Sequence, residues 1–130
     1  MIHPCPPAVA SCPPFPLRRD FGTAEACRFL ELTVAMAFRM PVEELRARTR
    51  RRAPVAFARQ VAMYVAHVRL GLSLTEVGRQ FGRDRTTAAH ACRVIEDQRE
   101  DPRLDRLLDG IEQAVGSWKD MIAANFWEAA

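Results

Sequence analysis

The sequence predicts an all-α fold: a compact helical domain that contains a helix-turn-helix. Apolar residues recur at the three- and four-residue spacing of a buried helix face, as in Ala88, Ala91, Cys92 and Ile95. No stretch alternates apolar and polar residues with period two, and no hairpin signal is present. The 130 residues are enough for one domain that buries a core, plus tails.

The first 22 residues are predicted to form a disordered, proline-rich tail. Six prolines fall within 1–16, and proline prevents the regular hydrogen bonding of helices and sheets; a tail that binds a partner protein is the alternative. No signal peptide and no apolar run long enough to cross a membrane is recognisable. The four cysteines form no CxxC pair. Neither a disulfide framework nor a metal site is therefore expected, and reduced cysteines fit a cytoplasmic protein.

Three elements are predicted between this tail and the middle of the chain. Thr23 is expected to cap a helix over 24–39. Pro41 ends that helix and begins a short one, since proline suits a first helical position. The arginine-rich stretch 46–54 has no apolar periodicity and is predicted to be a loop, and a helix follows over 57–69.

Two helices joined by a tight turn are predicted next, which is the arrangement of a helix-turn-helix. The stretch "SLTE" opens the first helix as a capping box. In such a box the Ser73 hydroxyl accepts from the backbone N–H of Glu76, and the Glu76 carboxylate reaches back to the serine N–H. Gly82 permits the turn, and Asp84 can cap the second helix, over 85–99.

Positive charge is concentrated in the middle of the chain. Between Arg46 and Arg93 there are eleven arginines and two acidic residues, a local charge of +9 within a formal net charge of +3. From Val94 onward, four basic residues stand against nine acidic ones. This imbalance favours a surface that binds a polyanion; a solvated, arginine-rich surface is the alternative.

The beginning of the second helix carries side chains that can read DNA bases. In a helix-turn-helix, the N-terminal residues of the second helix meet base edges in the major groove. Arg85 can bond guanine bidentately, and Asp84 can accept a hydrogen bond from cytosine. The methyl groups of Thr86 and Thr87 can touch that of thymine. Capping alone is the alternative, but a cap needs one such residue and not four.

The stretch "RRRAPVAFARQVAMYVAHVRLGLSLTEVGRQFGRDRTTAAHACRVIE" resembles the C-terminal DNA-binding domain (domain IV) of the bacterial replication initiator DnaA. The likeness spans 23–111 and is carried by "RQVAMYV", "LSLTEVG" and "RDRTTAAHACRVIE". It implies a nucleoid-associated protein that binds double-stranded DNA sequence-specifically and regulates replication initiation or transcription. The phosphate-binding loop GxxxxGK is absent from the sequence, so no ATPase activity, cofactor or catalytic residue is predicted. A protein-interaction module that kept the fold but lost specific DNA binding is the alternative.

The resemblance also implies which residues contact DNA. In that family a basic loop enters the minor groove, and Arg51, within the loop 46–52, matches the inserted arginine. Asp84, Thr86 and Thr87 match residues that read bases. His90 matches a family histidine that is either a packing residue or a DNA contact. The predicted contacts to the phosphate backbone are Arg50, Arg52, Arg59, His67, Ser73, Leu74, Arg83, Ala89 and His90.

Three differences from the family pattern alter the expected site. The family's "GGRDHTT" is one glycine shorter here, so the turn can set the second helix differently. Arg85 replaces a base-reading histidine, and arginine favours guanine. His67 replaces a lysine near the DNA backbone, which weakens one phosphate contact at neutral pH.

Residues 112–130 are predicted to extend the domain as a helix. This last helix begins at Asp101 and Pro102 and is expected to run to about Phe126. It carries an apolar stripe at helical spacing, with one further aromatic residue beside it: Val115, Trp118, Ile122, Phe126 and Trp127. Such a stripe most often packs on its own core. The matched domain should already be complete before this stripe, however, so we expect a homodimer or a partner-protein contact through the last four of these residues.

Overall fold

The structure, a computed structural model, describes residues 22–47 and 53–123. Its helices are α2 (Thr23–Ala37), α3 (Val42–Arg46), α4 (Ala53–Val68), α5 (Leu74–Phe81), α6 (Arg85–Gln98) and α7 (Pro102–Ala123). No strand occurs in the two described ranges, and the predicted all-α fold is confirmed. The proline-rich tail and the segment 48–52 lie outside the described residues.

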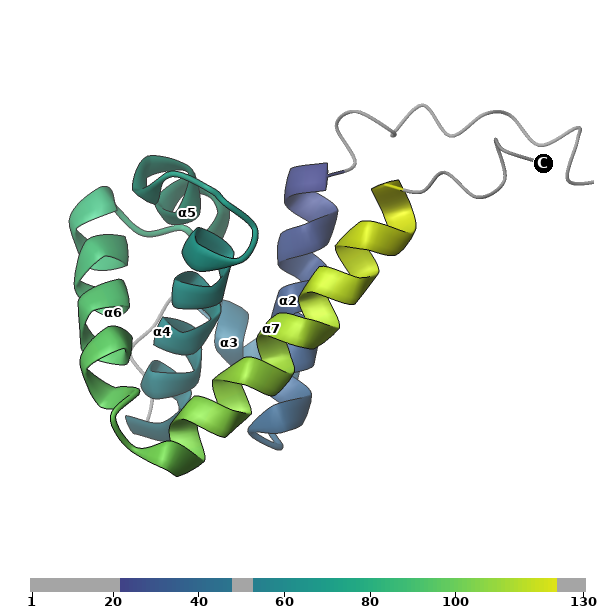
Figure 1. The fold of residues 1–130 in the computed structure, drawn as a ribbon. Helices are drawn as coiled ribbons and strands as arrows, with labels where there is room; N and C mark the ends of the chain where they lie inside the picture. Colours follow the sequence, from purple (N-terminus) through teal and green to yellow (C-terminus); the bar gives the residue numbers. More distant parts are fainter. Residues whose placement is uncertain (1–21, 48–52, 124–130) are drawn as a thin grey trace, which may run out of the picture.

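Helix α4 lies at the centre of the domain, with α5 and α6 on one side and α2 and α7 on the other (Figure 1). It packs against all five other helices, and every side chain from Val61 to Ala66 is at most 4 % exposed. A helix that is apolar all round must be covered on all sides. Leu30 of α2, Val77 of α5 and Ile95 of α6 join it in one core. The helix-turn-helix therefore rests on the same core as the rest of the domain.

Helix α2 differs from its predicted bounds at both ends. Gly22, with φ −70° and ψ −46°, is its N-cap, and no side chain caps it. The predicted Thr23 cap is therefore wrong: the chain is already helical before Thr23, whereas a capping side chain needs an extended N-cap backbone. The helix ends at Ala37 because Arg39 takes a left-handed φ of 57°, a conformation that terminates helices.

Helix α4 begins four residues earlier than predicted. It starts at Ala53 and not at 57, so the loop between α3 and α4 is shorter than the predicted 46–54. Pro54 falls in the first turn, where its missing N–H has no helical partner to lose. Val55 is buried in the same turn, and this burial favours helix where the arginine-rich composition indicated a loop.

Helix α7 is one continuous helix that packs along α2 (Figure 1). Asp101 begins it, as predicted, because its Oδ1 accepts a hydrogen bond from the N–H of Arg103 at 2.9 Å. Leu108, Ile111 and Val115 are buried on its inner face. The apolar stripe thus continues past position 111 without a break in the helix.

Trp118 of α7 is partly buried and packs against α2. Its ring stacks on Phe29 of α2, with the ring centroids 4.9 Å apart and an interplanar angle of 9°. Among the residues considered for a partner contact, Trp118 is thus engaged with α2. Phe126, Trp127 and the side chain of Ile122 lie outside the described residues. In the part of the chain that is described, no helix is long and apolar enough to span a bilayer.

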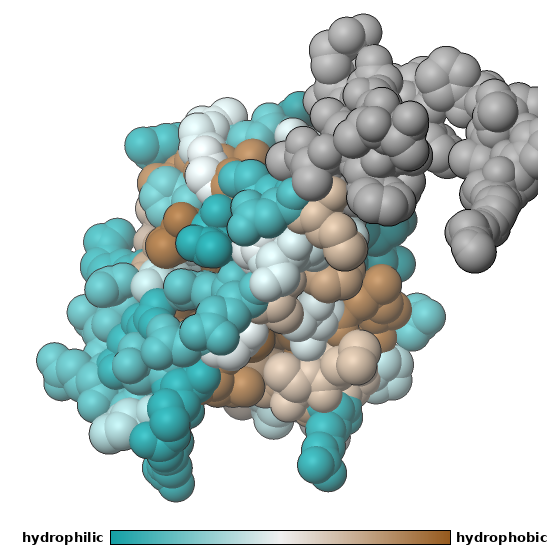
Figure 2. All heavy atoms as spheres, turned by 45° about the vertical axis from the view of Figure 1, so that its right-hand side comes forward, coloured by the Kyte–Doolittle hydropathy of each residue, from teal (hydrophilic) through white to brown (hydrophobic). Residues whose placement is uncertain are grey.

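The outer sides of α2 and α7 retain exposed apolar side chains. Met36, Met121 and Leu32 are 77 %, 64 % and 45 % exposed. Figure 2, which brings the right-hand side of Figure 1 forward, shows apolar surface (brown) between hydrophilic side chains (teal). This side of the domain therefore differs from the arginine-bearing helix-turn-helix on the other side of α4.

Candidate nucleic-acid interface

The first helix of the helix-turn-helix, α5, begins with the predicted serine cap. Ser73 has an extended backbone, and its Oγ accepts a hydrogen bond from the N–H of Glu76 at 3.1 Å. The Glu76 carboxylate turns to the following helical turn, where it accepts from Gln80 at 2.8 Å and from Arg79 at 2.9 Å. Both hydrogen bonds lower the pKa of Glu76, and the bond from Gln80 has the larger effect. The Glu76 carboxylate therefore pairs with side chains along α5, in place of the predicted bond back to the N–H of Ser73.

A left-handed glycine and a close backbone contact form the turn. Gly82 has φ 68° and ψ 33°, a conformation that favours glycine because no Cβ is strained. The N–H of Arg83 donates to Gly78 O at 2.8 Å. A Cβ on Gly78 would lie 2.6 Å from Arg83 O and 3.1 Å from Asp84 O. The turn therefore touches α5 at a residue without a side chain, and one glycine at 82 is enough to close it.

Asp84 caps α6, as predicted. Its Oδ1 accepts a hydrogen bond from the N–H of Thr87 at 2.8 Å, and its backbone is extended, with φ −85° and ψ 171°. This bond from the Thr87 backbone has the largest effect in lowering the pKa of Asp84, and a bond from the Thr87 side chain lowers it further. The carboxylate is thus ionised at neutral pH at a helix N-terminus, where negative charge is favourable. Because Asp84 is also exposed, the capping group lies at the surface where α6 begins.

Helix α6 has a buried face and an exposed one. Ala88, Ala91 and Ile95 are buried, whereas the predicted core residue Cys92 is half-buried. On the other side, four residues are exposed and two are half-buried: Arg85, Thr86, His90 and Arg93, with Thr87 and Ala89. The site predicted from sequence omits Arg93. Its helical spacing from Thr86 and His90 places it on their face and could have indicated it.

Three other predicted DNA contacts have partners within the protein. His67 Nδ1 lies 2.7 Å from Leu72 O, and since a carbonyl oxygen can only accept, the Nδ1–H group donates this hydrogen bond. Leu74 packs partly buried against the core. Arg83 Nη2 donates to Ala47 O at 3.5 Å, which links the turn before α6 to the end of α3.

Arg59, for which the sequence predicts a phosphate contact, is only 8 % exposed. Its guanidinium donates to backbone carbonyls at the C-terminal end of α3. Nε bonds Leu45 O at 3.0 Å, and Nη2 bonds Glu44 O at 3.1 Å and Ala47 O at 3.3 Å. The structure therefore places the Arg59 head group against the protein backbone.

The predicted basic loop, 46–52, is described only at its beginning. Arg46 pairs with Glu31 of α2, with Nε and Oε1 2.8 Å apart. Arg50, Arg51 and Arg52 lie outside the described residues. The minor-groove contact of Arg51 therefore remains a prediction.

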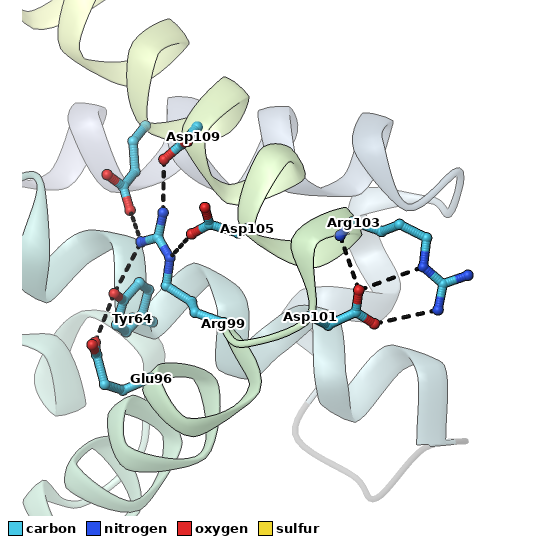
Figure 3. Close-up of polar contacts among 8 residues, drawn as sticks. Tyr64, Glu96, Arg99, Asp101, Arg103, Asp105 and Asp109 are labelled. Carbon is cyan, nitrogen blue, oxygen red and sulfur yellow. Dashed lines mark hydrogen bonds and ion pairs between the residues drawn. The ribbon is translucent and has the colours of Figure 1, made fainter.

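Arg99, just beyond the last residue of α6, joins three helices (Figure 3). Its guanidinium pairs with Asp105, Asp109 and Glu112 of α7 at 2.7, 2.7 and 2.8 Å, and it donates to the Tyr64 hydroxyl of α4 at 3.1 Å. Burial acts to lower the pKa of Arg99, but hydrogen bonds to Tyr64, Asp105 and Glu112 outweigh it and raise that pKa. Because its partners hold the planar guanidinium in one orientation, the network sets the direction of α6 relative to α4 and α7.

These features define a helix-turn-helix DNA-binding domain. A short helix, a tight turn and a second helix with an exposed polar N-terminal end form the arrangement in which the second helix enters the major groove. The chain belongs to the family described as the bacterial DnaA protein helix-turn-helix, whose model matches residues 30–95.

Similar proteins bear names connected with replication initiation. Over 89 residues the chain is 30 % identical to the chromosomal replication initiator protein DnaA of Thermoanaerobacter sp. (strain X514), covering 68 % of this chain and 20 % of that protein. Over 105 residues it is 32 % identical to DnaA of Treponema denticola, covering 76 % and 22 %. A crystal structure of a DNA replication initiation factor matches with a TM-score of 0.68 at 26 % identity, covering 77 % of this chain and 31 % of that one. The chain thus spans about a fifth of the length of these curated relatives.

Proposed function

We propose that this protein recognises double-stranded DNA in a sequence-specific manner through α6. The observation that carries the proposal is the exposed face of α6, on which Arg85, Thr86, His90 and Arg93 lie opposite the buried alanines. A recognition helix in the major groove presents such a face to base edges. The N-terminal end of the helix also favours phosphate, because it carries partial positive charge. Asp84 and Thr87 complete the proposed base contacts at this end.

The basic loop adds a contact in the minor groove in this proposal. Arg51 enters the groove, which is narrow and electronegative in A·T-rich DNA and attracts arginine. Phosphate contacts then fix the position of the domain on the duplex. The residues proposed for them are Arg50, Arg52, His67, Ser73, Leu74, Arg83, Ala89 and His90.

The proposed cellular role is regulation of replication initiation or transcription at the nucleoid, in the cytoplasm and without ATPase activity. Its support is the family: relatives named as chromosomal replication initiators share with this chain the helix-turn-helix segment. A protein that binds initiator-type boxes would occupy the same DNA sites as an initiator and so alter access to them.

Fluorescence anisotropy on two labelled duplexes at near-physiological salt tests the proposal. One duplex carries an initiator-type box, and the other carries the same bases scrambled. We expect a preference of at least about a hundredfold, since specific binders commonly exceed their nonspecific binding by ~10³ or more. If this box is not preferred, selection from random DNA identifies a changed site. Equal, salt-sensitive binding to every selected duplex would contradict sequence-specific recognition.

Arg85→Ala is expected to weaken binding to the preferred duplex by about 1–3 kcal/mol and to relax the preference at one base pair. The reason is that arginine bonds guanine bidentately, and alanine leaves those acceptors without a partner. Anisotropy on a set of single-base variants of the site measures both effects. Arg103→Ala removes the same charge from the start of α7 and is the matched control. Unchanged base preference in the Arg85 variant would remove Arg85 from the readout.

Substitutions of Asp84 should separate capping from base reading. Asparagine is as good an N-cap as aspartate and alanine is a poor one, so Asp84→Asn should keep the unfolding temperature and Asp84→Ala should lower it. Because the folded-state pKa of Asp84 is lowered, its stabilisation is present at neutral pH and is lost as the pH falls through that lowered pKa. A change in base preference for Asp84→Asn, at unchanged stability, assigns the carboxylate to DNA; unchanged preference leaves it as a cap.

The exposed apolar side chains of α2 and α7 favour a second candidate function, contact with another protein. We propose that Ile122, together with Phe126 and Trp127 further along the chain, forms a homodimer contact or docks a partner protein, next to exposed Met121 of α7. A dimer would suit paired half-sites on DNA. Analytical ultracentrifugation at high protein concentration measures the association, and a monomer throughout would contradict the homodimer.

A further inference from the structure

The inference concerns Arg59 and its contact with the end of α3. Among the residues that the structure describes, Arg59 is the one charged residue that is buried. A guanidinium is costly to bury unless its donors are bonded. Here Nε and Nη2 bond the carbonyls of Glu44, Leu45 and Ala47, at 3.0 to 3.3 Å. A phosphate would have to displace these bonds to reach the same donors.

The accepting carbonyls lie at the C-terminal end of α3, where a positive charge is stabilising. The last carbonyls of a helix have no helical N–H partner and carry partial negative charge. Helix α3 has five residues and ends at Arg46. Its Glu44 carbonyl accepts from the Ala47 N–H at 3.3 Å, and the carbonyls of Glu44, Leu45 and Ala47 have further donors from outside α3. Arg59 supplies them from α4, and thereby fixes how the chain leaves α3.

Ala47 connects this contact to the helix-turn-helix. Its carbonyl accepts from Arg59 Nη2 and, at 3.5 Å, from Arg83 Nη2. Arg83 lies in the turn directly before α6. One backbone oxygen is therefore shared by α4 and by the turn that sets α6, and in the sequence the arginines of the basic loop follow directly after it.

We infer that Arg59 is a positioning residue for DNA reading, which holds the chain at Ala47 in a fixed place relative to α6, and that it does not bind a phosphate. This inference rests on the proposed function. It deepens that function, because the spacing between the minor-groove and major-groove contacts depends on the Arg59 bonds.

Arg59→Lys separates the two roles. Lysine keeps the charge and can still bind a phosphate, but as a point charge it cannot replace a forked guanidinium that bonds several carbonyls. We expect about a tenfold loss of affinity, or ~1.4 kcal/mol, on the preferred duplex with A·T flanks. We also expect that the preference for A·T over G·C flanks is lost. Affinity and flank preference close to those of the wild type would overturn the inference.

Two double-mutant cycles exclude a merely structural effect. Combined with Arg51→Ala, Arg59→Lys should cause no further loss, because both act through the same contact. Combined with Arg85→Ala, its loss should be additive. Additive losses in both cycles overturn the inference while leaving specific binding intact, whereas a wild type that prefers no duplex overturns the proposed function as well.

All affinities are measured with the full chain at a temperature where thermal unfolding shows each variant to be folded. Should Arg59→Lys not fold, Arg59→Gln takes its place, because its side-chain amide can still donate a hydrogen bond to a carbonyl at the end of α3. Its loss should again be non-additive with Arg51→Ala. Independent losses from these two substitutions would overturn the inference.

Discussion

Gly78→Ala is expected to lower the free energy of unfolding by about 1–3 kcal/mol, the typical cost of overpacking a tight site. The added Cβ would lie 2.6 Å from Arg83 O and 3.1 Å from Asp84 O, and both are backbone atoms that cannot rotate away. Alanine has a helix propensity better than that of glycine by about 1 kcal/mol, but a contact this short outweighs the gain. Urea or thermal unfolding followed by circular dichroism measures the change.

The same substitution should weaken DNA binding beyond its effect on stability. The backbone of Arg83 and Asp84 must move away from α5, and Asp84 caps α6. The end of α6 that bears Arg85 is therefore displaced from the position that the core otherwise gives it. Anisotropy on the preferred duplex, at a temperature where the variant is folded, measures this second effect.

Gly110→Ala is the matched control for Gly78→Ala. Gly110 lies within α7, and nothing lies within 4 Å of its added Cβ. Alanine should therefore stabilise the protein by about 0.5–1 kcal/mol and leave DNA binding unchanged. The two glycine substitutions should thus change the free energy of unfolding in opposite directions. A Gly78 variant as stable as the Gly110 variant would show that the turn accommodates the added methyl group without loss of stability.

Arg99→Met should lower the free energy of unfolding by about 2–3 kcal/mol. Removal of one partner of a buried ion pair costs about 3–5 kcal/mol, and partial exposure reduces that figure here. The side chains of Arg99 and Glu112 are 18 % and 19 % exposed, but those of Asp105 and Asp109 are 45 % and 55 % exposed. The variant also leaves three carboxylates at neighbouring positions of α7, where like charges repel. Urea unfolding at neutral pH measures the loss.

Arg103→Met is the control for the Arg99 substitution. Arg103 makes the same type of ion pair four residues later in the chain, but its side chain is 84 % exposed and its carboxylate partner is Asp101. Exposed pairs of this kind contribute little to stability, so the control should unfold close to the wild type. Equal losses in the two variants would mean that the Arg99 network acts as an ordinary surface pair.

The helix-turn-helix could be predicted from the sequence because its determinants are local. Ser73 and Asp84 each bond a backbone N–H three residues away, and Gly82 supplies the left-handed turn by itself. Such interactions depend on a few consecutive residues, which a sequence pattern contains in full. The exposed arginine and threonine at the start of α6 followed from the same pattern, and Arg93 could have been added from helical spacing alone.

Thr23 and the start of α4 show where local reasoning failed, and Arg59 makes a contact that local reasoning could not include. Thr23 has the chemistry of a cap, but helical geometry already at Gly22 removes that role. Composition assigned the residues around Pro54 to a loop, while burial of Val55 makes them helix. For Arg59 the resemblance implies a phosphate contact, and no local pattern indicated its bonds to the end of α3. Its burial depends on carbonyls up to fifteen residues away.

The sequence by itself determined that the protein is all-α, where the helix-turn-helix lies and which residues cap its helices, because helical periodicity and capping act over a few residues. Only the tertiary structure decided which arginines are available to a ligand. Arg59 and Arg99 are engaged by groups from other helices, as far as 35 residues away in the chain, whereas Arg85 and Arg93 are exposed. The physical reason is that a guanidinium is held wherever folding brings enough acceptors together, and no local pattern records where those acceptors meet.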